Sequence, residues 1–295
     1  MSVDITVTKG VLEKATLIAK DLQKSLGNKE YQYSLYSYLD VSKRVKKVMT
    51  TVDLLGGASD KKILEIGSGM GMFVVAANQL GLDCVGVEPS AGSYRNLLVA
   101  QKMLLRANGL DEKKIIDASA EQLPFDDNSF DAVVSFQVIE HVLNPERVFG
   151  EALRVLKPGG VLYFEMPNYF SFFEGHYGII WLPFLAFSKK LARIYVKLLG
   201  KNPDFLGEVN FITPFYLRSI LLKSQLKFSI KNSVSSSADI PSINVKGSEL
   251  LPSRSENRHG AVAKTIFKII HAPGLRLIIK FLQLSESLVV IAKKS

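Results

Sequence analysis

Short apolar runs alternate with helical patterns over most of the chain. From residue 62 onward, five strand-like runs are separated by segments whose apolar residues recur every three or four positions. The runs lie at 63–66, 84–87, 115–116, 132–134 and 161–166. Near-continuous apolar strands that alternate with helices predict an α/β fold with a parallel sheet covered on both faces.

The N-terminal 60 residues have a different pattern, which predicts helices. Val11, Ala15, Ile18, Leu22 and Leu26 recur at helical spacing. A second helix is predicted after residue 40, because an Asp there can cap it and the pair of glycines at 56–57 can end it.

The alternation is interrupted at 168–211 and resumes with a helix from Thr213-Pro214 and a strand at 228–230. A Ser-rich loop is predicted over 233–260, then a broken helix over 261–283 and a last strand over 287–292. We therefore expect an N-terminal helical cap, residues 1–57, and a second unit, residues 58–295. The second unit has helical insertions at 168–211 and 234–284.

Composition is that of an ordinary globular protein, with 47% hydrophobic and 22% charged residues among 295. The single cysteine, Cys84, excludes an internal disulfide and predicts a reducing compartment. Residues 1–10 carry Asp4 and no apolar run, so no signal or transit peptide is expected. A cytoplasmic location is the resulting prediction.

The net charge of +9 comes from two segments that contain no acid. Residues 175–201 contribute five Lys or Arg and residues 261–283 contribute four. Because the rest of the chain is balanced, a diffuse nucleic-acid-binding surface is not expected.

The strongest chemical signal is a glycine-rich turn, Gly67-Ser68-Gly69-Met70-Gly71, directly after the first strand of the alternating region. Glycines in such a turn let a ligand approach the backbone closely. The spacing is Gly-x-Gly-x-Gly rather than Gly-x-Gly-x-x-Gly, which argues against a nicotinamide-linked dehydrogenase. An acid, Glu65, stands inside the strand itself.

Five pieces of the sequence, in order, resemble the class I S-adenosylmethionine-dependent methyltransferases. They are 65–71 (EIGSGMG), 87–90 (VEPS), 120–125 (AEQLPF), 127–133 (DNSFDAV) and 156–160 (LKPGG). The resemblance implies a Rossmann-like sheet, mostly parallel with one antiparallel strand near the edge. It also implies S-adenosylmethionine as the cofactor.

The same resemblance assigns the cofactor contacts. The residues that it implies are Glu65, Gly67, Ser68, Gly69, Gly71, Glu88, Pro89, Ser119, Ala120, Glu121 and Phe136. Glu88 ends the second strand, where a carboxylate can accept hydrogen bonds from both ribose hydroxyls. An acid commonly stands at position 119 in the family, whereas this chain has Ser119, with Asp117 two residues earlier.

Two histidines are candidate general bases, because imidazole titrates near neutrality. His141 follows the fourth strand in a Glu-His pair that resembles small-molecule and quinone O-methyltransferases, and His176 lies in the insertion after the fifth strand. Gln137 stands where some quinone enzymes carry a further acid that binds a metal, so no metal is predicted.

The expected reaction is methyl transfer to oxygen of a small-molecule or lipid-linked acceptor. A non-catalytic module that kept the fold and the cofactor is the alternative. The Asn/Asp-Pro-Pro-Tyr/Phe sequence of base-modifying amino methyltransferases is absent after the fourth strand, which argues against methylation of a nucleobase nitrogen.

The two basic segments, 175–201 and 261–283, predict peripheral contact with the inner face of a membrane or capture of an amphiphilic acceptor. In the first segment, one side of a helix carries only apolar residues: Phe187, Leu191, Ile194, Leu198 and Leu199. The alternative is that this side packs on the domain as a lid and the lysines face solvent.

Overall fold

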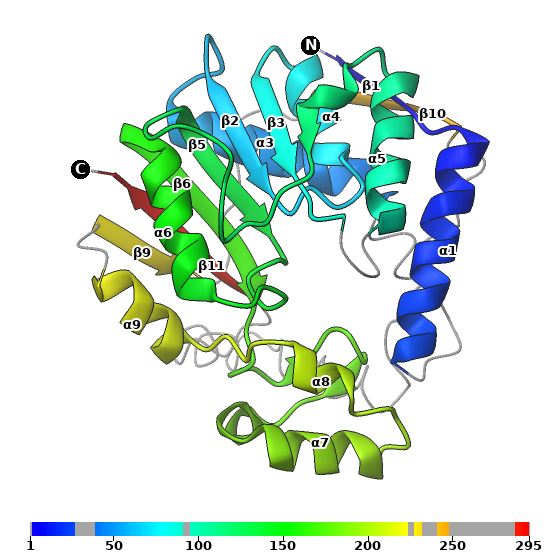
Figure 1. Cartoon of the computed structure of the whole chain (residues 1–295), viewed down its shortest axis with the longest axis vertical. Coiled ribbons are helices and arrows are strands. Elements are labelled where there is room, and N and C mark those ends of the chain that lie inside the picture. Colours follow the sequence, from blue (N-terminus) through cyan, green and yellow to red (C-terminus); the bar gives the residue numbers. More distant parts are fainter. Residues whose placement is uncertain are drawn as a thin grey trace.

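The computed structural model describes residues 2–26, 39–90, 95–223, 227–231, 241–247 and 287–294. Its centre is a seven-stranded sheet in the order β4-β3-β2-β5-β6-β11-β9 (Figure 1). The strands are β2 (Lys62–Ile66), β3 (Asp83–Val87), β4 (Ile115–Ile116), β5 (Phe130–Phe136), β6 (Leu156–Pro167), β9 (Lys227–Lys231) and β11 (Ser287–Lys293).

One strand, β11, runs against all the others. It pairs antiparallel with β6 on one side and with β9 on the other, whereas β2 to β6 pair in parallel. This topology confirms the predicted sheet, mostly parallel with an antiparallel strand next to the edge. The carboxyl ends of β2, β3, β5 and β6 therefore meet at one edge of the sheet, where open α/β sheets bind ligands.

Helices cover both faces of the sheet, as the sequence predicts. The helices of the described chain are α1 (Lys9–Ser25), α3 (Val41–Leu55), α4 (Met72–Gln79), α5 (Arg95–Ala107), α6 (Pro145–Val155), α7 (Lys189–Leu198), α8 (Phe205–Glu208) and α9 (Pro214–Lys223). Helices α1, α3, α4 and α5 share one hydrophobic cluster with the sheet, and α6 and α9 share a second one. The predicted cap at Asp40 is confirmed, since its carboxylate accepts from the Lys43 N–H. The Asn144 side chain caps α6 in the same way and accepts from the Arg147 N–H.

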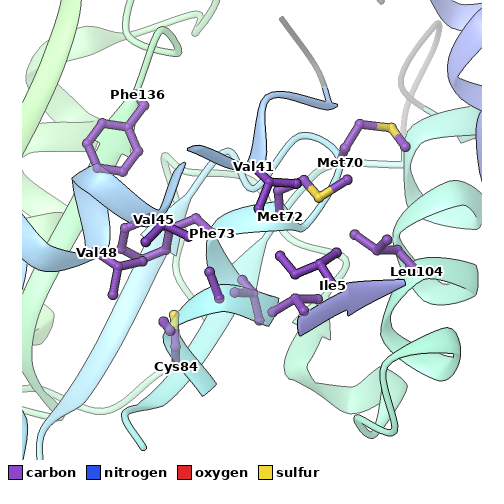
Figure 2. Packing of buried hydrophobic residues seen from close by; sticks show 14 of the residues in the cluster. Ile5, Val41, Val45, Val48, Met70, Met72, Phe73, Cys84, Leu104 and Phe136 are labelled. Carbon is purple, nitrogen blue, oxygen red and sulfur yellow. The ribbon is translucent and has the colours of Figure 1, made fainter. Parts of the chain in front are cut away.

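The N-terminal segment contains a strand that the sequence did not predict. β1 (Ser2–Thr6) pairs in parallel with β10 (Ser242–Lys246), which lies in the stretch predicted as a Ser-rich loop. Val3 and Ile5 of β1 are fully buried in the cluster that also holds Phe73 and Leu104 (Figure 2). The first residues of the chain therefore belong to the same core as the sheet, and the boundary predicted at residue 57 remains a prediction.

The insertion at 168–211 folds around a third hydrophobic cluster with Trp181 at its centre. It contains a short hairpin of β7 (Phe173–Glu174) and β8 (Ile179–Ile180), a 3₁₀ turn at Pro183–Phe187, α7 and α8. Trp181 is fully buried and its indole N–H donates to the Tyr169 carbonyl over 2.9 Å. Figure 1 shows α7 and α8 beyond the carboxyl ends of β5 and β6.

Among the described residues, no helix is both long and apolar enough to cross a bilayer. The predicted basic segment 261–283 lies outside the described residues.

Replacing Ile5 tests whether the N-terminal strand belongs to the core. Ile5→Ala is expected to lower the free energy of unfolding by about 2–5 kcal/mol, because it leaves a cavity at a fully buried position. Leu17→Ala on α1, where the side chain is 50% exposed, is the control and should change it by about 0.5 kcal/mol or less. Equal stability of both variants in urea denaturation would contradict this packing.

Candidate active site

The glycine turn joins β2 to α4 in a conformation that favours glycine. Gly67, Gly69 and Gly71 have φ values of 71°, 54° and 78°. A Cβ on Gly67 would lie 2.2 Å from the Val138 side chain, so the turn also needs glycine for space. The turn therefore touches the segment after β5, which carries one of the predicted histidines.

Glu88 closes the turn from the neighbouring strand. The Gly69 N–H donates to the Glu88 carboxylate over 2.8 Å, and the side chain is 5% exposed. Burial raises the pKa of Glu88 to about 7, although the hydrogen bond from Gly69 opposes that rise. The structure thus places Glu88 against the glycine turn, and its predicted contact with the ribose hydroxyls stays a prediction.

Glu65 stands in β2, two residues before the first glycine of the turn, and is almost fully buried. One of its carboxylate oxygens, Oε2, has no hydrogen-bond partner. Burial raises its pKa to about 8; the charges of Arg44 and Lys47 on α3 oppose the rise and that of Glu88 adds to it. A buried carboxylate oxygen without a partner is costly, which fits a site that receives a donor or a positive charge.

Gln101 on α5 was missed by the sequence reasoning. Its side chain is fully buried and donates to the Ser68 hydroxyl over 3.3 Å and to the Gly69 carbonyl. It therefore fixes the turn from behind. Its position in the apolar row of α5, four residues after Leu97, was the available signal.

Asp117 and Glu121, the acids on either side of the predicted Ser119, lie in the loop after β4. Asp117 accepts from the backbone N–H of Ser90 over 2.9 Å and from its hydroxyl, which joins the two strand ends. Glu121 accepts from the Leu143 N–H over 2.8 Å and from the Ser119 hydroxyl. Both carboxylates thus have protein partners that shape the loops.

Phe136, also predicted at the cofactor, packs in the hydrophobic cluster. Its ring centroid lies 5.4 Å from that of Phe73 and 5.2 Å from that of Tyr163. The Lys47 ammonium lies 4.3 Å from the same centroid and forms a largely buried ion pair with Glu165. This pair was not predicted, because Lys47 is one of several lysines on α3 and only the tertiary contact with β6 distinguishes it.

These residues fit S-adenosylmethionine. The cofactor carries a sulfonium and an ammonium and has no phosphate, so it suits buried carboxylates rather than a cationic cradle. Glu65 and Glu88 would face its positive groups and hydroxyls, and the glycine turn leaves room for it near the backbone. When bound, the cofactor supplies an electrophilic methyl group.

The second part of the site joins the two predicted histidines. The ring centroids of His141 and His176 lie 5.3 Å apart at nearly a right angle, and Phe205 of α8 covers both rings. His141 stands in the turn after β5, and His176 comes from the hairpin of the insertion. Asn210, near the end of the insertion, connects the insertion to the turn after β5, since its N–H donates to the Glu140 carbonyl over 2.7 Å.

Two buried carboxylates accompany the histidines. Glu174 accepts from His176 through Nδ1, with 2.7 Å between the atoms, and also from the Tyr177 N–H over 2.8 Å. Glu140 is fully buried and neither of its carboxylate oxygens has a hydrogen-bond partner. Burial raises the pKa of Glu140 to about 7.

The two histidines differ in basicity. Burial, together with the charge of His176, lowers the pKa of His141 to about 3, so that this ring is neutral at physiological pH. Burial also acts against protonation of His176, but the charge and hydrogen bond of Glu174 outweigh it and hold the pKa above its ordinary value. His176 is therefore the ring that can accept a proton near neutrality.

A group of donors that can hold a metal ion is present, although the sequence predicted none. Glu140, His141 and His176 each offer one ligand atom, and these atoms lie within 4.8 Å of one another. His176, which belongs to the insertion, supplies the third donor. Position 137, where some quinone enzymes carry an acid, is Gln in this chain.

A small pocket lies beside this group, at the ends of β5 and β6. Its lining includes Gln137, Asn168, Tyr169 and Glu174. Gln137 has a φ of 60°, and its N–H donates to the Glu165 carbonyl over 2.7 Å. A residue other than glycine in this strained region is common where a loop is shaped for a ligand.

The fold and the glycine turn define a Rossmann-like domain of the methyltransferase type. Residues 64–164 match the family described as a methyltransferase domain. An uncharacterized methyltransferase of Mycolicibacterium gilvum is 37% identical over 114 residues, which cover 39% of this chain and 42% of that protein. One of Mycolicibacterium vanbaalenii is 31% identical over 141 residues, 48% of this chain and 52% of that protein.

Two solved structures share the fold. The YcgJ protein of Bacillus subtilis has a TM-score of 0.50 and 17% identity, over 86% of this chain and 99% of that one. A geranyl diphosphate methyltransferase in complex with S-adenosylmethionine also has a TM-score of 0.50 and 17% identity, over 85% of both chains. The match with the curated relatives spans about half of their length or less. Residues 64–164 thus form a class I S-adenosylmethionine-dependent methyltransferase domain.

Replacing Glu88 tests the cofactor site. Glu88→Ala is expected to weaken S-adenosylmethionine binding by about 10- to 100-fold, because charge-assisted hydrogen bonds are lost. Calorimetry measures the dissociation constant, and Glu13→Ala, an exposed acid on α1, is the control. Unchanged affinity in Glu88→Ala would remove this residue from the site.

Proposed function

We propose that the chain transfers the methyl group of S-adenosylmethionine to a hydroxyl of a small or lipid-linked acceptor. The observation that carries this proposal is the Glu174–His176 pair, which lies with His141 at the same edge of the sheet as the glycine turn. A carboxylate that orients an imidazole and raises its pKa is an arrangement typical of a general base.

In this mechanism His176 takes the proton of the acceptor hydroxyl. Glu174 holds Nδ1, so Nε2 is the nitrogen that accepts the proton, and the negative charge of Glu174 stabilises the imidazolium. Glu65, Glu88 and the glycine turn would hold the cofactor, which would supply the electrophilic methyl group that the acceptor oxygen receives, and the electron pair of the carbon–sulfur bond would stay on sulfur. The side chains of His141 and Phe205 pack around His176 and limit water at this position.

The pocket beside the pair supports an acceptor with an apolar part. Tyr169 and Phe173 contribute aromatic walls, whereas Gln137 and Asn168 contribute polar groups. The buried Cys84 is consistent with the reducing, cytoplasmic compartment that the sequence predicts, which remains part of this proposal.

Turnover tests the proposal against its alternative, a non-catalytic module that holds the cofactor. The full chain is incubated with S-adenosylmethionine carrying a labelled methyl group and a panel of phenolic, sugar and lipid-linked alcohols. Transfer of label to an acceptor oxygen is expected, and the same turnover is expected after dialysis against a chelator. Cofactor binding without transfer to any alcohol would favour the module, and activity lost on chelation and regained with Mn²⁺ would make the histidine group a metal site.

Replacing the histidines tests the base. His176→Gln is expected to lower turnover by about 10²-fold or more, with cofactor affinity unchanged, and His141→Gln to lower it less. A base must be neutral, so activity should fall as the pH drops through the raised pKa of His176. Glu174→Gln removes the charge that raises this pKa, and the acidic limb of the pH profile should move to lower pH. A limb that stays in place in Glu174→Gln contradicts this assignment.

A further inference from the structure

The segment of the insertion that spans the 3₁₀ turn and α7 packs on the rest of the insertion through one side of the helix and through Leu185 of the turn. Ala192 and Val196 are the buried residues of α7, and they pack in the cluster around Trp181. The Tyr195 hydroxyl donates to the Ile180 carbonyl over 2.9 Å and fixes the helix to the hairpin. The other residues of α7 are partly or fully exposed.

The side that the sequence marked as apolar is exposed. Phe187 is 67% exposed and Leu198 81% exposed, and Leu191 and Ile194 between them are each about half exposed. These positions follow one another at spacings of four, three and four residues, so they form one row along the helix. Phe184, at 58% exposure, extends the row into the 3₁₀ turn. Within the described residues, the row is therefore mostly exposed rather than packed on the domain as a lid.

Basic residues flank the row without acids among them. The segment carries Lys189, Lys190, Arg193, Lys197 and Lys201 and has no Asp or Glu. Arg193 pairs with Asp204 over 2.9 Å. Lys190 and Lys197 form no ion pair with any acid in the part of the chain that the structure describes. Long lysine side chains can keep their ammonium groups in the polar layer while their stems cover apolar surface.

We propose that this face, Phe184 to Lys201, docks on the surface of an anionic lipid bilayer. A row of large exposed apolar side chains with cationic flanks matches the apolar interior and the negative headgroups of such a surface. A second copy of the chain fits less well, because an isologous contact would bring Lys190 and Lys197 of both copies together, and neither lysine has an acid partner among the described residues. The proposal does not depend on the methyl transfer reaction.

Docking would place the insertion, which carries Glu174 and His176, against the lipid surface. His176 and Glu174 belong to the hairpin that packs on α7 through Trp181.

Co-sedimentation of the full chain with vesicles tests the proposal. Binding is expected to vesicles of phosphatidylcholine with phosphatidylglycerol at low salt, and weaker binding at high salt, because the lysine contribution is screened. Phe187→Ser with Leu198→Ser, and separately Lys190→Glu with Lys197→Glu, should each weaken binding about tenfold or more. Leu222→Ser on α9, at 64% exposure, is the matched control and should bind as the parent does.

Three outcomes would overturn the proposal. These are no sedimentation with anionic vesicles at low salt, equal binding to pure phosphatidylcholine, and equal loss of binding in the Leu222→Ser control. A concentration-dependent dimer that Phe187→Ser with Leu198→Ser abolishes, without vesicle binding by the parent, would assign the face to a second copy. Circular dichroism of each variant shows that a loss of binding is not a loss of fold.

Discussion

The hydrogen bond from the Gly69 N–H to the buried Glu88 carboxylate is the contact on which the arrangement of the cofactor site depends. It joins the turn after β2 to the end of β3, and it requires a backbone in the left-handed region. Gln101 fixes the same turn from behind, and Val138 fills the space beside Gly67. Because Val138 stands in the segment that carries Glu140 and His141, the turn also fixes where the second part of the site begins.

The insertion at 168–211 contributes both the proposed base and the exposed apolar face of α7. Its hairpin supplies Glu174 and His176, and Asn210 ties its far end to the turn after β5. Its own cluster around Trp181 packs the hairpin that carries this pair against α7. The matched family region ends at residue 164, so the insertion lies outside it.

Much of the fold could be predicted from local pattern, and the rest depends on contacts between distant residues. The strands from β2 to β6 and the caps at Asp40 and Asn144 follow from short runs of sequence. The pairing of β1 with β10 does not follow from local pattern, because the paired residues, such as Ser2 and Ser242, lie far apart in the sequence. On α7 the pattern identified the apolar row but not its environment, since the smaller residues Ala192 and Val196 make the close contact. In the site, the sequence reasoning singled out Glu65, Glu88 and the histidines. Gln101 and Asn210 gain their roles through tertiary contacts, and Glu174 gains its role through the hairpin that also carries His176.

The central claim is that buried acids at the glycine turn receive a positively charged cofactor. In the free protein, burial raises the pKa of Glu65 to about 8 and that of Glu88 to about 7, so both are partly protonated near neutrality. A cationic ligand favours the ionised carboxylates and should expel protons. Calorimetric titration with S-adenosylmethionine in buffers of different ionisation enthalpy should therefore show proton release near pH 7, and S-adenosylhomocysteine, which lacks the sulfonium charge, should release less. A binding enthalpy that is the same in every buffer would contradict the account.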